Sequence, residues 1–452
     1  MLLLWGAFFL VLGPIRTPGD GDLYWQRWLG DLMLQSHTLP TMLGSETFTA
    51  AGALWVPQEW LFSLMVAFAA GHHISVLLSI LVSALPLAIL TTIYLRARDS
   101  AGPEAIGLVL LFSGLALLES FGVRAQVLGW AMFAAFMFFL ERRDRWQLAA
   151  IPTAILWANL HASVAIAPVL VLARIVALAF DGGWKALRSR EVAILFGTVL
   201  ALFCTPLGWR LPVYAIALAG SPIRHFIQEW QPSGMGDFSF LFGALPLALA
   251  VLAGGRTTLW NDKLRSFPAI VLFAAMLFAS RNVPLFAIAA APLAAIGLGL
   301  RIPRIRDIGP RITELEPAAI VAICAVMLVA GVELAVIQRH APERVPITAI
   351  ASLDDGATHR LLCENFTWCS LALERPNLRV FIDGRCDPYP LAVWRDYIAA
   401  IAGGKSWSSP FRRYGVDTVV AARGGRLATA LEKSPGWKST FEDRTYVVLH
   451  RD

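Results

Sequence analysis

Long apolar runs recur along this chain and constrain its fold more than any other feature. Stretches of roughly 15–22 residues, such as 75–95 and 283–300, carry almost no charged side chains. Lipid offers no water to pair with backbone N–H and C=O groups, so such segments cross membranes as α-helices. A hydrophobic fraction of 57%, with only 15% charged residues, also lies outside the range of soluble proteins. The sequence therefore predicts an α-helical polytopic membrane protein.

The hydropathy pattern predicts about eleven spans, with one further segment whose behaviour decides the topology. The expected spans are 1–15, 75–95, 103–119, 124–140, 147–160, 162–180, 191–208, 238–254, 266–280, 283–300 and 317–337. Residues 57–71 form a shorter apolar stretch that opens with Pro57, Gln58 and Glu59. Residues 1–15 lead into Arg16 without a small-residue cleavage site, so we interpret them as a retained helix rather than a signal peptide.

Basic residues gather in alternate loops if 57–71 does not cross the membrane. Residues 16–74 then form one first outer loop, and 209–237 form another. The opposite set of loops carries most of the arginines and lysines, including Arg142, Arg143 and Arg145. Because cytoplasmic loops are enriched in Lys and Arg, this predicts a cytoplasmic N-terminus. If 57–71 did cross, every later loop would exchange sides. The net charge of +6 is explained by these loops and indicates no nucleic-acid partner.

The chain is expected to divide into a transmembrane domain, 1–338, and an extracytoplasmic α/β domain, 339–452. In the second part, strands are expected at 379–383 and 417–421, helices at 390–402 and 425–433, and a hairpin at 437–442 and 445–450. This order predicts a small α/β module with some parallel pairing. Outside the cytoplasm, one pair among Cys363, Cys369 and Cys386 could form a disulfide, and the sequence leaves the pairing open.

Asp20-Gly-Asp22, at the mouth of the first span, is the leading candidate site. Two acids at this spacing can hold a divalent cation or act as a catalytic base. The predicted topology places the other unusual polar residues on the same outer side. These are Glu119, Arg124, Asn159, His161, Arg224, His225, Gln228, Glu229, Arg281, Asn282, Asp383 and Arg385. Together, such groups could bind a lipid-linked phosphate and activate a hydroxyl.

Each candidate also has a structural explanation. Asp20 and Asp22 could be solvated loop acids, and Glu119 with Arg124 could be an ion pair at two helix ends. His161 could be a cap or a buried hydrogen-bonding group. Arg281 and Asn282 could cap short helices, and Asp383 could hydrogen-bond the backbone of Gly384 and Arg385 in a strand-end turn. Their joint placement on one face favours function.

Several segments resemble the GT-C superfamily of integral membrane glycosyltransferases. They are the D-x-D-x-x-W pattern that begins at Asp20, the stretch TFTAAGALWVPQEWL (47–61), WANLH (157–161), IQEW (227–230), SRNVPLF (280–286) and FIDGRCDPY (381–389). The resemblance covers most of the chain and is closest to a family 39-like group of bacterial proteins. It implies a multi-pass protein of the bacterial cytoplasmic (inner) membrane, with the active site and the C-terminal domain on the periplasmic or extracellular side.

The resemblance also implies an inverting transfer of sugar from a polyprenyl-phosphate-linked donor to an acceptor hydroxyl on a glycan, lipid or protein. Asp20 or Asp22 matches the essential acid of the first outer loop, and Glu119 matches a second acid. Arg124, Arg224 and Arg281 match, by position, residues that bind the lipid phosphate. Mg²⁺ or Mn²⁺ at Asp20 and Asp22 is a candidate cofactor, although the chain lacks a clear D-x-D in the second outer loop.

Two other classes of function stay open from the sequence. A transporter or flippase of lipid or glycan would place charges within spans, where this chain has Arg174 and Glu333. A non-catalytic membrane assembly protein would use its outer domain to recruit a partner.

Overall fold

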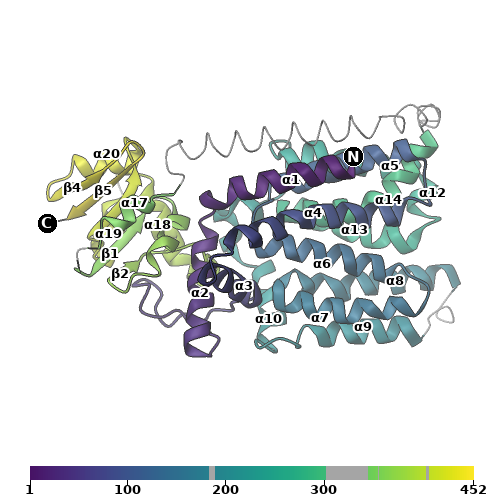
Figure 1. Cartoon of the computed structure of the whole chain (residues 1–452), viewed down its shortest axis with the longest axis horizontal. Coiled ribbons are helices and arrows are strands. Elements are labelled where there is room, and N and C mark those ends of the chain that lie inside the picture. Colours follow the sequence, from purple (N-terminus) through teal and green to yellow (C-terminus); the bar gives the residue numbers. More distant parts are fainter. Residues whose placement is uncertain (183–188, 302–344, 355, 404–406, 452) are drawn as a thin grey trace. The chain divides into compact units, whose positions relative to one another are not determined.

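The structure, a computed structural model, describes residues 1–182, 189–301, 345–354, 356–403 and 407–451 (Figure 1). It falls into two compact units. Unit 1 comprises Met1–Pro14, Ser79–Ala219 and Ile227–Glu333, and unit 2 comprises Ile15–Leu78, Gly220–Phe226 and Leu334–Asp452. The expected span 317–337 and the expected boundary at 338 and 339 lie outside the described residues.

Unit 1 is a bundle of apolar helices. Its members are most of α1 (Leu2–Arg16) and α4 (Ser75–Ala97), together with α5 (Pro103–Leu118), α6 (Ala125–Leu140), α7 (Ala150–Leu160), α8 (Ile166–Gly182), α9 (Ser189–Ala201), α10 (Arg210–Ala219), α11 (Leu245–Gly254), α12 (Arg256–Leu259), α13 (Lys263–Phe278) and α14 (Val283–Arg301). In Figure 1, α6 and α7 run alongside each other, as do α8 and α9, and these pairs are in contact.

Helix α14 forms the centre of this bundle, since it packs against α5, α11 and α13. Its sequence is rich in alanine and glycine, and small residues let helix backbones approach closely in lipid. Gly297 shows how close: a methyl group there would lie 1.9 Å from the carbonyl oxygen of Ala250 on α11. Any larger side chain at Gly297 would force the two helices apart.

Among the described residues, three helices are long and apolar enough to cross a membrane: Ser75–Ala97, Ala162–Gly182 and Ser280–Arg301. Shorter apolar helices match most of the other expected spans, including Pro103–Leu118 and Ala125–Leu140. The count of eleven spans stays a prediction. The expected span 191–208 is wrong at its C-terminal end, because α9 ends at Ala201 and a turn with Gly208 at φ +54° leads into α10.

Unit 2 contains a five-stranded mixed sheet in the order β2-β1-β3-β5-β4. The strands are β1 (His359–Cys363), β2 (Leu378–Val380), β3 (Thr418–Ala422), β4 (Trp437–Glu442) and β5 (Tyr446–Arg451). β1 pairs in parallel with β2 and β3, and β5 is antiparallel to β3 and β4. The helices of this module are α17 (Ile347–Ala351), α18 (Leu391–Ile401), α19 (Ser408–Tyr414) and α20 (Arg426–Glu432).

The small α/β module and its parallel pairing are confirmed, with two corrections. β1 was not expected from the sequence, and the strand expected at 379–383 ends at Val380, so that Phe381–Arg385 form a turn. A disulfide joins Cys363 at the end of β1 to Cys369, with the two Cα atoms 5.7 Å apart. This settles the pairing that the sequence left open.

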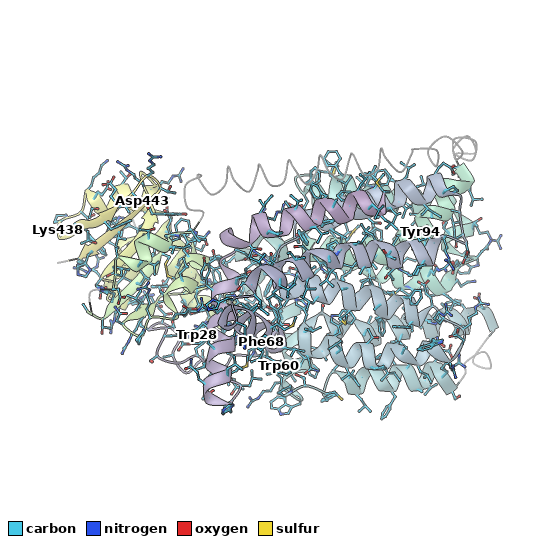
Figure 2. All side chains as sticks on the ribbon, viewed as in Figure 1. Trp28, Trp60, Phe68, Tyr94, Lys438 and Asp443 are labelled. Carbon is cyan, nitrogen blue, oxygen red and sulfur yellow. A yellow bond between two sulfur atoms is a disulfide. The ribbon has the colours of Figure 1, made fainter. Side chains whose placement is uncertain are left out.

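Unit 2 also contains the segment that follows the first span. Helices α2 (Asp22–Ser36) and α3 (Trp60–Gly71) pack against each other, and Figure 2 labels Trp28 on α2 and Trp60 on α3. α3 has 12 residues. At about 1.5 Å per residue this is roughly 18 Å, which is short of the 30 Å or so of a hydrocarbon core. Other apolar helices of this chain are equally short, such as α7 with 11 residues, so the expectation that 57–71 does not cross stays a prediction.

Candidate functional site

The two first-loop acids occupy the turn into α2. Asp20 is only 7% exposed and lies directly after a short 3₁₀ turn (Thr17–Gly19). Its Oδ1 atom accepts a hydrogen bond from the Asp22 backbone N–H at 3.1 Å. Asp22 is the first residue of α2, where a negative charge is stabilised by the helix dipole, and its Oδ1 atom lies 3.4 Å from the Trp25 indole N–H. The turn therefore fixes both carboxylates at one helix N-terminus.

The FIDGR turn (381–385) lies directly against these acids within unit 2. A methyl group at Gly384 would lie 3.1 Å from Asp22 Oδ1 and 3.0 Å from the Trp25 ring. The Gly384 N–H donates to Ser370 Oγ at 3.0 Å. The Asp20–Asp22 segment and the FIDGR turn are thus packed together, although they lie roughly 360 residues apart in the sequence. Glycine is required at position 384 for this close approach.

Asp383 and Arg385 form a buried ion pair in this turn, and both side chains are 0% exposed. Asp383 accepts hydrogen bonds from the Arg385 backbone N–H, from its Nε and Nη2 atoms, and from the Tyr389 hydroxyl at 2.6 Å. Burial lowers the pKa of Arg385, but the nearby charge of Asp383 outweighs it and holds that pKa well above its ordinary value. Burial, followed by the charge of Asp383, likewise raises the pKa of the Tyr389 hydroxyl well above its usual range.

First-loop residues complete the surroundings of Arg385. Arg385 Nη1 donates to Glu46 Oε1 at 2.8 Å. The guanidinium also lies 5.0 Å from the ring centres of both Trp28 and Trp55, which is cation–π distance. In addition, the Val380 N–H donates to the Glu46 carbonyl at 2.8 Å, so the first-loop chain pairs with the edge of the sheet beside β2. Arg385 thereby ties the first loop to the C-terminal module.

Gln26 of α2 connects that helix to α3 through two side-chain hydrogen bonds. Gln26 is 2% exposed; its amide N–H donates to the Glu59 carboxylate, and its amide oxygen accepts from the Ser63 hydroxyl. Burial of a polar group is favourable only when its hydrogen bonds are made, as they are here. This contact fixes α3 relative to the helix whose first residue is Asp22.

In unit 1, Glu119 forms an acid pair with Asp237, a residue that the sequence reasoning missed. Glu119 lies at the C-terminal end of α5, where its Oε2 atom accepts from the Ser239 N–H at 3.1 Å. Burial and a hydrogen bond with Glu119 raise the pKa of Asp237 to about 6. Paired carboxylates can share a proton or hold a divalent cation. Asp237 belongs to no recognisable motif, and only its position after a glycine-containing loop (231–236) could have marked it as a candidate in the sequence.

His161 and Arg281, which the predicted topology places in two different outer turns, are in contact in unit 1. His161 is 4% exposed, and its Nδ1 atom lies 2.8 Å from Ser163 Oγ. Arg281 Nη2 lies 3.4 Å from His161 Nε2, and because a guanidinium can only donate, Nε2 is the acceptor and the neutral ring carries its proton on Nδ1. Burial, together with the charge of Arg281, lowers the pKa of His161 to about 3.

The neighbouring segments hold Arg281 in place. Its guanidinium lies 5.3 Å from the Trp230 ring centre, and Ser280 Oγ donates to the Glu229 carbonyl at 3.2 Å. Asn282 donates from its side chain to the Ala275 carbonyl, which is the capping role that the sequence allowed. WANLH, IQEW and SRNVPLF are therefore packed together.

The predicted site residues divide between the two units. Unit 2 holds Asp20, Asp22, Arg224, His225, Asp383 and Arg385, and unit 1 holds Glu119, Arg124, Asn159, His161, Gln228, Glu229, Arg281 and Asn282. Arg224 and His225 lie in a 3₁₀ turn (Pro222–Phe226), whose Phe226 stacks on Trp394 of α18. Arg124 precedes α6 directly. Convergence of the two sets in one site stays a prediction.

No protein-family model matches this sequence, and no curated protein sequence matches it. The structure, by contrast, is similar to that of the archaeal oligosaccharyltransferase AglB from Archaeoglobus fulgidus. The structure of AglB in complex with an inhibitory peptide and a dolichol-phosphate aligns with a TM-score of 0.55 and 13% identity, over 98% of this chain and 73% of that chain. The chain shares the fold of this oligosaccharyltransferase.

Two further A. fulgidus oligosaccharyltransferase structures agree with this. One is a complex with Zn and sulfate, with a TM-score of 0.57 and 12% identity over 100% of this chain and 73% of that chain. The other is tethered by a disulfide bond to an acceptor peptide containing the NVT sequon, with a TM-score of 0.57 and 13% identity over 100% and 74%. At this level of identity the likeness establishes the fold.

Proposed function

We propose that this protein is a membrane glycosyltransferase that moves a sugar from a polyprenyl-phosphate-linked donor to an acceptor hydroxyl outside the cytoplasm. The observation that carries the proposal is the packing of Asp20-Gly-Asp22 against the FIDGR turn on a GT-C-like fold. A buried ion pair and two tryptophans hold this arrangement. Rigid support of this kind is what a catalytic carboxylate needs.

In the proposed reaction, Asp22 accepts the proton of the acceptor hydroxyl. The hydroxyl oxygen forms a bond to the anomeric carbon, and the bond from that carbon to the phosphate oxygen breaks, which releases the polyprenyl phosphate. Attack from the face opposite the phosphate inverts the anomeric centre. We assign the base to Asp22 rather than Asp20 because Asp22 is the more exposed, whereas Asp20 orients it through the hydrogen bond to its backbone.

Cations near the leaving phosphate and a second pair of acids complete the proposal. Arg281 and Arg124, with Arg224 and His225, are the candidates to bind the phosphate, and neutral His161 keeps Arg281 in position. Glu119 and Asp237 orient the acceptor or hold Mg²⁺ or Mn²⁺, which favour carboxylate oxygens. Asp383 and Arg385 were expected to contact substrate; their complete burial and mutual pairing favour a positioning role instead.

Transfer assays with matched variants test this proposal. Membranes from a strain that lacks the gene would receive wild-type protein, Asp22→Asn or Asp20→Asn, together with polyprenyl phosphates that carry radiolabelled hexoses or pentoses. We expect label to move into an acceptor fraction with wild-type protein, to be lost with Asp22→Asn and to fall strongly with Asp20→Asn.

Asp31→Asn is the matched control, since Asp31 lies on the same helix and makes a half-exposed ion pair with Arg27. That variant should retain wild-type transfer, because exposed ion pairs contribute at most about 1 kcal/mol. Wild-type transfer by both Asp20→Asn and Asp22→Asn, in protein that is inserted normally, would refute the proposal.

A further inference from the structure

Three adjacent strands of the unit 2 sheet bring two histidines and an aspartate to the same end of the sheet. His359 opens β1, Asp417 directly precedes β3, and His450 lies near the end of β5. Leu361, two residues after His359, is opposite Thr418 in the parallel pair β1–β3, and Thr418 is opposite His450 in the antiparallel pair β3–β5. Because side chains alternate along strands, His359, Thr418 and His450 share one face.

The three side chains converge on one point, the Thr418 hydroxyl. Its Oγ1 atom lies 3.0 Å from His359 Nδ1 and 3.1 Å from His450 Nδ1, and it donates to Asp417 Oδ1 at 2.7 Å. Asp417 is held by the Arg360 backbone N–H, which donates to the same Oδ1 atom at 2.9 Å. One ligand atom from each of His359, Asp417 and His450 lies within 4.8 Å of the others.

We propose that His359, Asp417 and His450 bind one Zn²⁺-class transition-metal dication. Imidazole nitrogens with a carboxylate suit zinc, cobalt, nickel or copper, whereas magnesium and calcium prefer sites built from oxygen alone. Neighbouring ligands around Zn²⁺ are roughly 3.3 Å apart for bonds of 2.0–2.2 Å. Small side-chain rotations therefore convert the cluster into a coordination shell.

Burial and the surrounding hydrogen bonds suit such a site. His359 is 4% exposed, while Asp417 and His450 are half-buried, so a metal has a path in and a coordination position for water. Thr418 is fully buried and touches all three ligands, and such second-layer contacts orient metal ligands. Bound metal would join β5, and with it the β4–β5 hairpin, to β1 and β3.

This site is distinct from the proposed catalytic acids. The FIDGR turn follows the carboxyl end of β2, whereas His359 and Asp417 lie at the amino ends of the parallel strands β1 and β3. The two features are therefore at opposite ends of the sheet. Zinc binding here does not depend on glycosyl transfer, and loss of transfer in Asp22→Asn would leave it unchanged.

Replacing Lys438 should strengthen metal binding, which only a metal site explains. It is exposed on β4, directly opposite His450, and Figure 2 labels it on the β4–β5 hairpin. Residues opposite each other in an antiparallel pair share a face. Its positive charge repels a bound dication, so Lys438→Met should tighten metal binding severalfold. A cluster held only by hydrogen bonds gives no reason for that change.

The experiment uses the full-length protein in detergent, prepared without a polyhistidine tag and stripped with EDTA. Zn²⁺ binding is measured by calorimetry, and Co²⁺ binding by its visible ligand-field absorption. We expect the wild type to bind one equivalent that requires Asp417 and His450, besides any metal held by Glu119 and Asp237. His450→Ala and Asp417→Asn should each weaken Zn²⁺ binding at least 100-fold, and Thr418→Val about 10- to 100-fold.

Controls separate this site from surface binding and from misfolding. His72→Ala changes an exposed histidine outside the cluster and should leave the Zn²⁺ affinity unchanged. The thermal unfolding of each metal-free variant shows whether it folds, and Asp417→Asn preserves the shape of the ligand. The absence of a bound equivalent in the wild type, or unchanged affinity in folded Asp417→Asn and His450→Ala, would overturn the proposal. An equal loss in His72→Ala would show binding to surface histidines and would overturn it as well.

Discussion

Replacing Arg385 with alanine should destabilise unit 2 more than any exposed substitution in it. The change leaves Asp383, which is 0% exposed, without its charged partner, and removing one member of a buried ion pair costs about 3–5 kcal/mol. Two cation–π contacts, at 5.0 Å to Trp28 and to Trp55, add about 0.5–1 kcal/mol each. The expected loss in the free energy of unfolding is therefore about 4–7 kcal/mol.

Thermal unfolding of the full-length protein in detergent measures this loss. For a unit of 150–250 residues, each kcal/mol lowers Tm by about 2–4 °C, so Arg385→Ala should lower it by roughly 8–28 °C. A second readout is the rate at which maleimide labels Cys386, the residue after Arg385, in a Cys204→Ser/Cys324→Ser background. That rate should rise, because the turn opens more often.

Two further variants define what would refute the reasoning. Arg379→Ala removes an exposed arginine from β2 in the same unit and should change Tm by less than about 2 °C. The double variant Asp383→Asn/Arg385→Gln should cost less than the sum of its single changes, because neither partner is left as a buried unpaired charge. A Tm for Arg385→Ala that lies within about 2 °C of the wild-type Tm would show that the ion pair does not hold the turn.

Three other predictions concern unit 1 and the topology. The pKa of His161 in the folded protein is about 3, below its ordinary value of 6.5, so between these pH values only the unfolded chain binds the proton. The stability of the fold should therefore fall as the pH drops from 6.5 toward 3. His161→Gln should reduce this pH dependence in thermal unfolding. Because the pKa of Asp237 is raised to about 6, the acid pair loses a proton as pH rises through 6, so Mn²⁺ affinity measured by electron paramagnetic resonance should increase there, and Glu119→Gln should weaken it at least 10-fold. With native cysteines replaced, a cysteine introduced at His73 should react with impermeant maleimide from outside intact cells, and one at Asp99 should not; labelling of Asp99 would overturn the topology.

Long-range contacts explain what the sequence could and could not reveal. Most helices were predictable because their apolar runs are continuous, as in α4 and α14. The end of α9 was not, because the apolar run continues past Ala201 although a turn interrupts the helix there. β1 was missed because its five residues, HRLLC, begin with two polar side chains and show no clear alternation; its place inside the sheet comes from pairing with β2 and β3.

The same reasoning applies to the candidate site. FIDGR is conspicuous in the sequence, and this made Asp383 and Arg385 look like groups that contact substrate. Arg385 has its second carboxylate partner in the first loop, about 340 residues earlier in the chain, where no local pattern marks Glu46 as that partner. Once those contacts are counted, Asp383 accepts from Arg385 and Tyr389 through both carboxylate oxygens and has no exposed surface through which to take a proton from an acceptor. Asp22, which the FIDGR turn supports through Gly384, is only partly buried and can be reached by a substrate hydroxyl. The conspicuous motif is therefore the support, and the acid that it holds is the better candidate for the chemistry.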